Sequence, residues 1–168
     1  TFDQMWWPIT AAGTPTAHWS YVYTLWLAAV YALFGVHPLI ARMLQAALTG
    51  ALMPLCAYRL ARRVWPGAGR PGAVNWVAIA TAAWTAIYGY FIYYTASLMT
   101  EAFFMTGVLW CLECGLRAYE LARTAHTPEH ALAAGWWTWL ELGLALAITV
   151  YLRQVFLFFV PMMLLWLV

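Results

Sequence analysis

Apolar stretches, separated by short polar or Pro/Gly-containing interruptions, divide the chain into six segments. The segments are about Trp19–Phe34, Leu39–Val64, Val74–Tyr94, Leu98–Leu121, Ala131–Leu152 and Val155–Val168. The four middle segments have the length of roughly 20 residues that a membrane helix needs. The pattern predicts an all-α membrane protein in which residues 1–18 form a loop ahead of the helices.

The last two segments have no glycine or proline between them. As one helix, residues 131–168 would be roughly 57 Å long at 1.5 Å per residue, against a hydrocarbon core of roughly 30 Å. The chain should therefore turn near Arg153 and Gln154, the polar interruption between the two segments.

The composition agrees with the pattern. Hydrophobic residues make up 65% of the chain and charged residues 8%, and the mean hydropathy is +0.73. A soluble domain is about half apolar and a quarter charged, so the soluble class is excluded. A net charge of +2 gives no indication of nucleic-acid binding. We expect residues 1–168 to form a single partial transmembrane domain, a piece of a larger polytopic bundle.

Arginine positions predict the orientation. Six arginines flank the two loops that share a side if each middle segment spans once; they are Arg59, Arg62, Arg63, Arg70, Arg117 and Arg123. By the positive-inside rule these loops are cytoplasmic. Glu101, Arg42 and Arg153 then face the outside.

The first segment allows two interpretations. If Trp19–Phe34 spans the membrane, Asp3 is cytoplasmic; if it lies along the outer interface, Asp3 shares a side with Glu101. Aromatic residues are spread along the whole segment, which favours an interfacial helix. We therefore expect about five transmembrane helices and one interfacial helix.

Glu101 is the first candidate for a functional residue. The thirty residues before it and the eleven after it contain no Asp, Glu, Lys or Arg. A carboxylate in such surroundings costs several kcal/mol unless it reaches water, a cation or a metal. The alternative is that Glu101 only stabilises the positive N-terminus of the following helix.

Other polar residues have simpler interpretations. Glu113 and Arg117 are spaced i, i+4 and should pair. Glu141 should snorkel or find an arginine partner. Cys111 and Cys114 form a CxxC within a predicted helix, without a second pair, which favours core packing over metal binding.

Several short motifs, taken together, resemble a family. They are Tyr21–Ala28, Leu33–Gly35, Ala41–Leu44, Leu60–Trp65, Leu98–Glu101 and Tyr151–Gln154. Their order and spacing over about 150 residues are similar to bacterial family 39-type glycosyltransferases, relatives of protein O-mannosyltransferases and of the aminoarabinose transferase acting on lipid A.

The resemblance implies a C-type glycosyltransferase superfold. Such enzymes take a sugar from a polyprenyl-phosphate donor and transfer it at the outer face of the membrane. A catalytic acid lies in the first outer loop, and a second acid corresponds to Glu101. The usual His-Pro-Pro-Leu-Tyr stretch reads His18-Trp19-Ser20-Tyr21-Val22 here. Asp3 is the carboxylate left for the first-loop role, unless that acid precedes Thr1.

This chemistry assigns roles to five residues. Asp3 and Glu101 are the candidate catalytic acids, and together they could hold a divalent metal, Mg or Mn, although some family members need none. Arg153 and Arg42 are candidates for binding the donor phosphate, and His18 joins the site by resemblance. The alternatives are an interface anchor for Arg153 and a structural ion pair for Arg42.

The sequence therefore predicts a multi-pass glycosyltransferase of the bacterial inner (plasma) membrane. Its partners would be a polyprenyl-phosphate-linked sugar, a lipid, glycan or protein acceptor, and membrane lipids. Two other classes remain: a non-catalytic membrane subunit of a larger complex, and a transporter. Only Gly50 and Pro54 hint at the broken helices that a transporter needs.

Cysteine labelling tests the orientation. Cysteines introduced at Thr100 and at Gly69 should react with membrane-impermeant reagents from opposite sides, because one membrane segment separates them. Labelling of both from the same side would contradict the topology. A cysteine at Thr10 shows whether segment 19–34 spans.

Overall fold

The prediction of an all-α fold is confirmed. The computed structural model describes residues 20–66, 74–124 and 128–167, with backbone only for 128–134 and 167, and these residues form helices without a strand. The helices are α1 (Tyr21–Phe34), α2 (Pro38–Val64), α3 (Trp76–Ile87), α4 (Gly89–Ala96), α5 (Glu101–Thr124), α6 (Pro128–Leu152), η1 (Gln154–Phe158) and α7 (Phe159–Leu167). Asp3 and His18, and with them the predicted 1–18 loop, lie outside the described residues.

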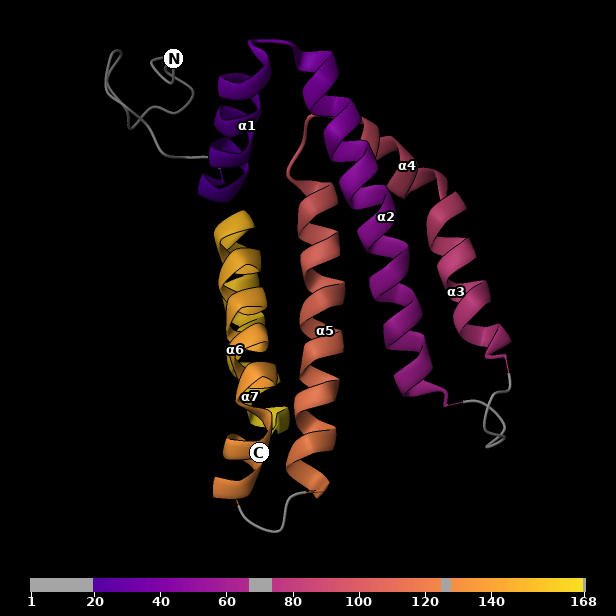
Figure 1. Ribbon diagram of the computed structural model, residues 1–168, viewed down its shortest axis with the longest axis vertical. Coiled ribbons are helices and arrows are strands. Elements are labelled where there is room, and N and C mark those ends of the chain that lie inside the picture. The colour runs from indigo at the N-terminus through magenta and orange to yellow at the C-terminus, as the bar shows by residue number, and fades with distance from the viewer. Residues whose placement is uncertain (1–19, 67–73, 125–127, 168) are drawn as a thin grey trace.

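Two helical hairpins form the body of the molecule (Figure 1). Helices α2 and α5 run in the same direction, and α3–α4 and α6 return. The ends of α2 and α5 therefore lie at one end of the molecule, which we call the arginine end after Arg62, Arg63 and Arg123. The opposite end, where α5 begins and α6 finishes, is the Glu101 end.

Fewer helices can span a membrane than the sequence predicted. Helix α2 and residues Gly135–Leu152 of α6 are long and apolar enough, and α3 with α4 makes a third candidate if the bent pair is one span. The expected count of about five is not supported. Helices α1 and α7 are too short, and α5 carries Glu113, Arg117 and Glu120 along its 24 residues.

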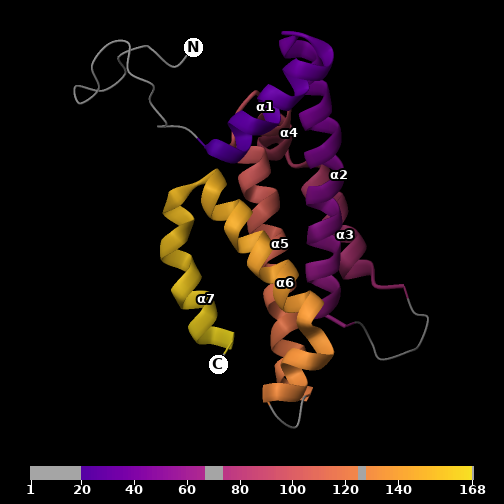
Figure 2. The ribbon, with the colours of Figure 1, turned by 60° about the vertical axis from the view of Figure 1, so that its left-hand side comes forward.

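The structure breaks two of the predicted segments. Segment 131–152 is kinked at Gly135, whose backbone is not helical (φ −128°, ψ 22°). Segment 74–94 was expected as one helix, but Tyr88 is extended (ψ 114°) and the halves α3 and α4 are bent by 52°. The turn expected near Arg153 is confirmed, since Arg153 is extended between α6 and η1. Beyond this turn α7 folds back alongside the bundle (Figure 2).

Small residues bring α5 and α6 together. The buried core here contains Cys111, Cys114, Ala118, Leu142, Ala145, Leu146, Phe156 and Met163. A Cβ at Gly107 would lie 2.5 Å from Thr149 Oγ1, so α5 needs glycine at this position. Close backbone approach of this kind is typical of helix packing in membranes.

Gln45 is the polar centre of the Glu101 end. Its side chain is fully buried, and its amide nitrogen lies 2.6 Å from the carbonyl oxygen of Ser97 and 3.3–3.4 Å from those of Tyr94, Thr95 and Met99. Its amide oxygen accepts a 3.1 Å hydrogen bond from Tyr23 Oη. One side chain of α2 thus holds α1 and the α4–α5 connection in place.

We expect Gln45→Leu to destabilise the protein by about 1–3 kcal/mol, because it leaves the phenol of Tyr23 and the carbonyls at the end of α4 without their partner. Thermal unfolding in detergent measures the loss. Gln154→Leu is the matched control, since Gln154 is exposed. Equal stability of the two variants would contradict the role of Gln45.

Candidate functional site

Glu101 and Arg153 form an ion pair at the Glu101 end. Arg153 Nη2 donates to Glu101 Oε1 at 2.8 Å, although 52 residues separate the two in the chain. The side chain of Arg153 is 48% exposed and that of Glu101 20%. The pair is therefore open to a ligand from solvent or from the membrane surface.

Local structure fixes both members of the pair. Glu101 is the first residue of α5, where a carboxylate stabilises the positive helix N-terminus. Arg153 is held in the turn after α6 by its backbone bond to Thr149 O, and its guanidinium lies 5.6 Å from the ring centroid of Phe104. Glu101 thus combines the helix-end role with a cationic partner, which the sequence had left as alternatives.

Aromatic rings flank this pair. Phe103 of α5 packs against Tyr23 and Trp26 of α1, with ring centroids 6.0 and 5.0 Å away. Burial, with smaller contributions from Tyr31 and Glu101, raises the pKa of Tyr23 to about 12. The phenol therefore stays protonated and remains a donor to Gln45.

Within the described residues, no contact joins the other predicted site residues to the Glu101–Arg153 pair. Arg42 is exposed near the start of α2 and has no salt bridge within the part of the chain that the structure describes. Because Asp3 is not described, a metal site shared by Asp3 and Glu101 stays a prediction, as does the role of His18. The aromatic run of residues 88–94 forms α4 and its break, with Tyr88, Tyr90 and Tyr93 exposed.

A second polar cluster lies deeper, between α2, α5 and α6. The nitrogen–oxygen distances are 2.9 Å for Arg63–Glu113, 2.6 Å for Arg63–Glu120, 2.6 Å for Arg117–Glu113 and 2.6 Å for Arg117–Glu141. Glu113 is only 2% exposed. The predicted Glu113–Arg117 pair and the arginine partner of Glu141 are confirmed.

Arg63 was not predicted as a member of this cluster. The sequence predicts Arg63 only as one of the arginines flanking a loop, whereas in the structure both Arg63 and Arg117 bond to Glu113. The available signal was the position of Arg63 at the end of a neighbouring segment, the end predicted to be cytoplasmic. That signal cannot distinguish Arg63 from Arg59 or Arg62.

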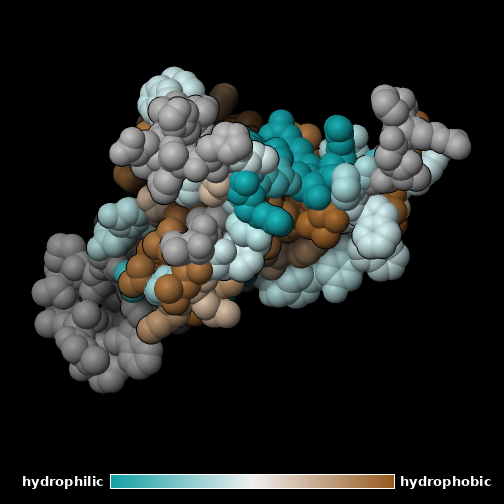
Figure 3. Space-filling model, turned by 90° about the horizontal axis from the view of Figure 1, so that it is seen from below, coloured by the Kyte–Doolittle hydropathy of each residue, from teal (hydrophilic) through white to brown (hydrophobic). Residues whose placement is uncertain are grey.

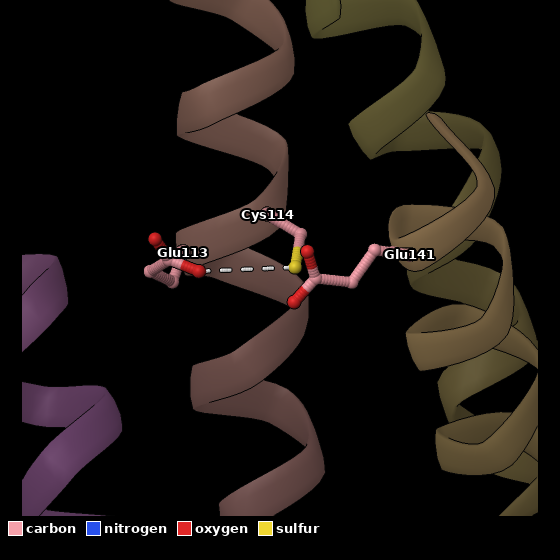
Figure 4. A group of neighbouring side chains, drawn as sticks. All are labelled: Glu113, Cys114 and Glu141. Carbon is pink, nitrogen blue, oxygen red and sulfur yellow. Dashed lines mark hydrogen bonds between the residues drawn. The ribbon is translucent and has the colours of Figure 1, made fainter. Parts of the chain in front are cut away.

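Glu113, Cys114 and Glu141 bring three possible metal-ligand atoms within 4.8 Å of one another (Figure 4). The carboxylates are already engaged: Arg117 bonds to both, and Trp110 Nε1 donates to Glu141 Oε1 at 3.0 Å. A guanidinium between two carboxylates repels a cation, so this donor set favours an ion-pair cluster over a metal site. Cys111 and Cys114 are fully buried, as expected for core packing.

No family model, curated protein or solved structure matches the chain. The family resemblance therefore rests on the sequence motifs alone.

We expect Glu113→Ala to lower stability by about 3 kcal/mol, the lower end of the range for breaking a buried ion pair, since each arginine keeps a second carboxylate. The exposed Glu120→Gln should cost less than about 1 kcal/mol. Thermal or denaturant unfolding in detergent compares the two. If Glu120→Gln lowered stability as much as Glu113→Ala, burial of the carboxylate would not be what determines the loss of stability.

Proposed function

We propose that this chain is part of a membrane glycosyltransferase that moves a sugar from a polyprenyl-phosphate donor to a lipid, glycan or protein acceptor, in the bacterial inner membrane. The observation that carries the proposal is the contact between Glu101 and Arg153. These two residues belong to separate motifs of the resemblance. Contact between them is what a shared site requires.

Arg153 has the geometry of a phosphate ligand. Its bond to Glu101 uses Nη2 and leaves Nη1 and Nε free of Glu101, while the side chain is half exposed. Guanidinium groups bind phosphate through such pairs of N–H donors. The positive charge would stabilise the phosphate that departs when the sugar is transferred.

The surface next to Arg153 suits a prenyl chain. Val155, Leu157 and Phe158 follow Arg153 in the chain and are 75%, 58% and 85% exposed. A lipid-linked phosphate needs a cation and an apolar surface side by side. The turn from α6 into η1 offers both.

Glu101 has a positioning role in this proposal. Because Oε1 is occupied by Arg153, Glu101 orients the guanidinium. Among the described residues, Oε2 accepts only a long, 3.5 Å hydrogen bond from Thr100 Oγ1, and it would be the oxygen offered to the acceptor or a divalent metal. The proton of the acceptor hydroxyl then goes to a different carboxylate, for which Asp3 is the candidate. Arg42 and His18 remain second candidates for binding the donor.

The transporter hypothesis has one observation in its favour, the broken α3–α4 pair. The cavity beside this break is about 30 Å³, lined by Thr49, Gly50, Pro54 and Thr85 among others, which is room for about two waters at most. Carbonyls at the end of α4 are engaged by Gln45. In ion-coupled transporters such carbonyls coordinate the ion, so we favour the transferase.

The test is sugar transfer in membranes that contain the full-length protein. A panel of radiolabelled polyprenyl-phosphate hexoses and pentoses is supplied, and label is followed into membrane lipid, glycan and protein. We expect transfer from at least one donor. Glu101→Gln and Arg153→Ala should each reduce it by about 10²-fold or more, because Arg153→Ala removes the cation at the departing phosphate and Glu101→Gln removes the carboxylate that orients that cation.

Arg59→Ala is the matched control. Arg59 is an exposed arginine on α2, away from the Glu101–Arg153 pair, and its loss should leave transfer unchanged. Amounts of folded protein are compared by size-exclusion chromatography in detergent. No transfer from any donor, or full transfer by both site variants, would refute the proposal. Normal assembly and function of both variants is the outcome expected of a non-catalytic subunit.

A further inference from the structure

The two helices that end at the arginine end carry the same short motif. Residues 57–63 of α2 read Ala-Tyr-Arg-Leu-Ala-Arg-Arg, and residues 118–124 of α5 read Ala-Tyr-Glu-Leu-Ala-Arg-Thr. Five of the seven positions are identical. The alanine that opens each motif is buried, at 4% exposed in Ala57 and fully in Ala118. The motif therefore presents the same face in both helices.

Each copy seats an arginine on a tyrosine ring one turn earlier. The guanidinium carbon lies 5.6 Å from the ring centroid both for Arg62 over Tyr58 and for Arg123 over Tyr119. Cation–π contacts of this kind restrain the side chain and leave its N–H donors free at the edge. Tyr119 is itself stacked on Trp166 of α7, with centroids 4.8 Å apart. The two guanidinium groups are thus exposed but restrained.

A salt bridge joins the two copies. Arg63, next to Arg62, donates to Glu120 at 2.6 Å, and Glu120 lies one turn before Arg123. This bond holds the ends of α2 and α5 side by side and partly neutralises Glu120. Seen from this end, hydrophilic residues gather in one patch bordered by hydrophobic surface (Figure 3).

Stabilisation of the helix ends explains only part of this arrangement. An arginine in the last turn favours the negative C-terminus of a helix wherever its side chain points. That effect does not require the guanidinium to lie over a tyrosine ring. Nor does it require a salt bridge between the two copies of the motif. Two restrained guanidinium groups facing outward at the end of a spanning helix match the headgroup level of a bilayer, where clustered arginines attract anionic lipids.

We infer that the arginine end is a binding site for an anionic phospholipid, with Arg62 and Arg123 as the residues that bind the headgroup phosphate. Val64 and Trp65, both about 60% exposed, follow Arg63 and provide apolar surface for the glycerol and upper acyl chains. This site lies at the opposite end from Glu101 and does not depend on the proposed transferase activity.

Native mass spectrometry of the delipidated full-length protein tests the inference. The protein is supplied with equimolar dioleoylphosphatidylglycerol and dioleoylphosphatidylcholine in detergent. We expect preferential retention of phosphatidylglycerol. Arg62→Gln and Arg123→Gln should each weaken it about fivefold, the change expected for one basic residue near the headgroups, while Arg62→Lys keeps most of the binding. Glu120→Gln should strengthen it, because a negative charge is removed from the patch.

Arg59→Gln is the control, an exposed arginine one turn before Arg62 that lies over no tyrosine ring among the described residues. It should leave phosphatidylglycerol retention unchanged, and helical content by circular dichroism confirms that each variant is folded. Equal retention of the two lipids by the unmodified protein would overturn the inference. So would a loss in Arg59→Gln as large as in Arg62→Gln, since binding would then follow net charge rather than this site.

Discussion

The structure depends on neutralising one buried carboxylate, that of Glu113. Arg117 from the same helix and Arg63 from α2 reach it, and Arg117 extends the contact to Glu141 on α6. These bonds fix the rotation and register of three helices. Glu101 lies 12 residues before Glu113 on α5, and Arg153 lies 12 residues after Glu141. Because α5 and α6 are antiparallel, both spacings climb about 18 Å along the bundle at 1.5 Å per residue. Glu113 and Glu141 lie at the same height, with carboxylate oxygens within 4.8 Å of each other, and Arg117 bonds to both. The register that this shared arginine holds is therefore the one that brings Glu101 to Arg153.

The Glu113 cluster and the Glu101–Arg153 pair are both carboxylate–guanidinium ion pairs, but they differ in exposure. Around Glu113 the charged groups pair with one another inside the bundle. Because Glu113 is buried, loss of a partner would leave a desolvated charge, so these ion pairs have a structural role. At Glu101 the pair is half open, and Arg153 borders an exposed apolar surface. An interior ion-pair cluster can hold helices in place but cannot reach a lipid-linked substrate. The open pair can reach one, which is why we assign the proposed chemistry to it.

The features that the sequence predicted are local in the chain. The lengths of the apolar stretches predicted the main helices. The thickness of the bilayer, which residues 131–168 would exceed as one helix, predicted the turn at Arg153, and i, i+4 spacing predicted the Glu113–Arg117 pair. The missed features depend on distant partners. Gln45 bonds to carbonyls 49 to 54 residues away, and Arg63 meets a carboxylate 50 residues away. The bend at Tyr88 has no proline to mark it. Segment hydropathy predicts more spans than the structure supports, because it does not register the break in segment 74–94 or the charged residues of α5.

The most direct test of the account is whether the Arg117 register controls the Glu101–Arg153 contact. Cysteines replace Glu101 and Arg153 in the full-length protein in membranes, and a short bifunctional thiol reagent is added. Intramolecular cross-links are then quantified by mass spectrometry of the digested peptides, with cysteines at Glu101 and Trp137 as the distant control pair. The account predicts a high yield for the first pair, little for the control, and a marked fall in the first yield when Arg117→Ala is added. No cross-link between positions 101 and 153, or a yield that Arg117→Ala leaves unchanged, would contradict it.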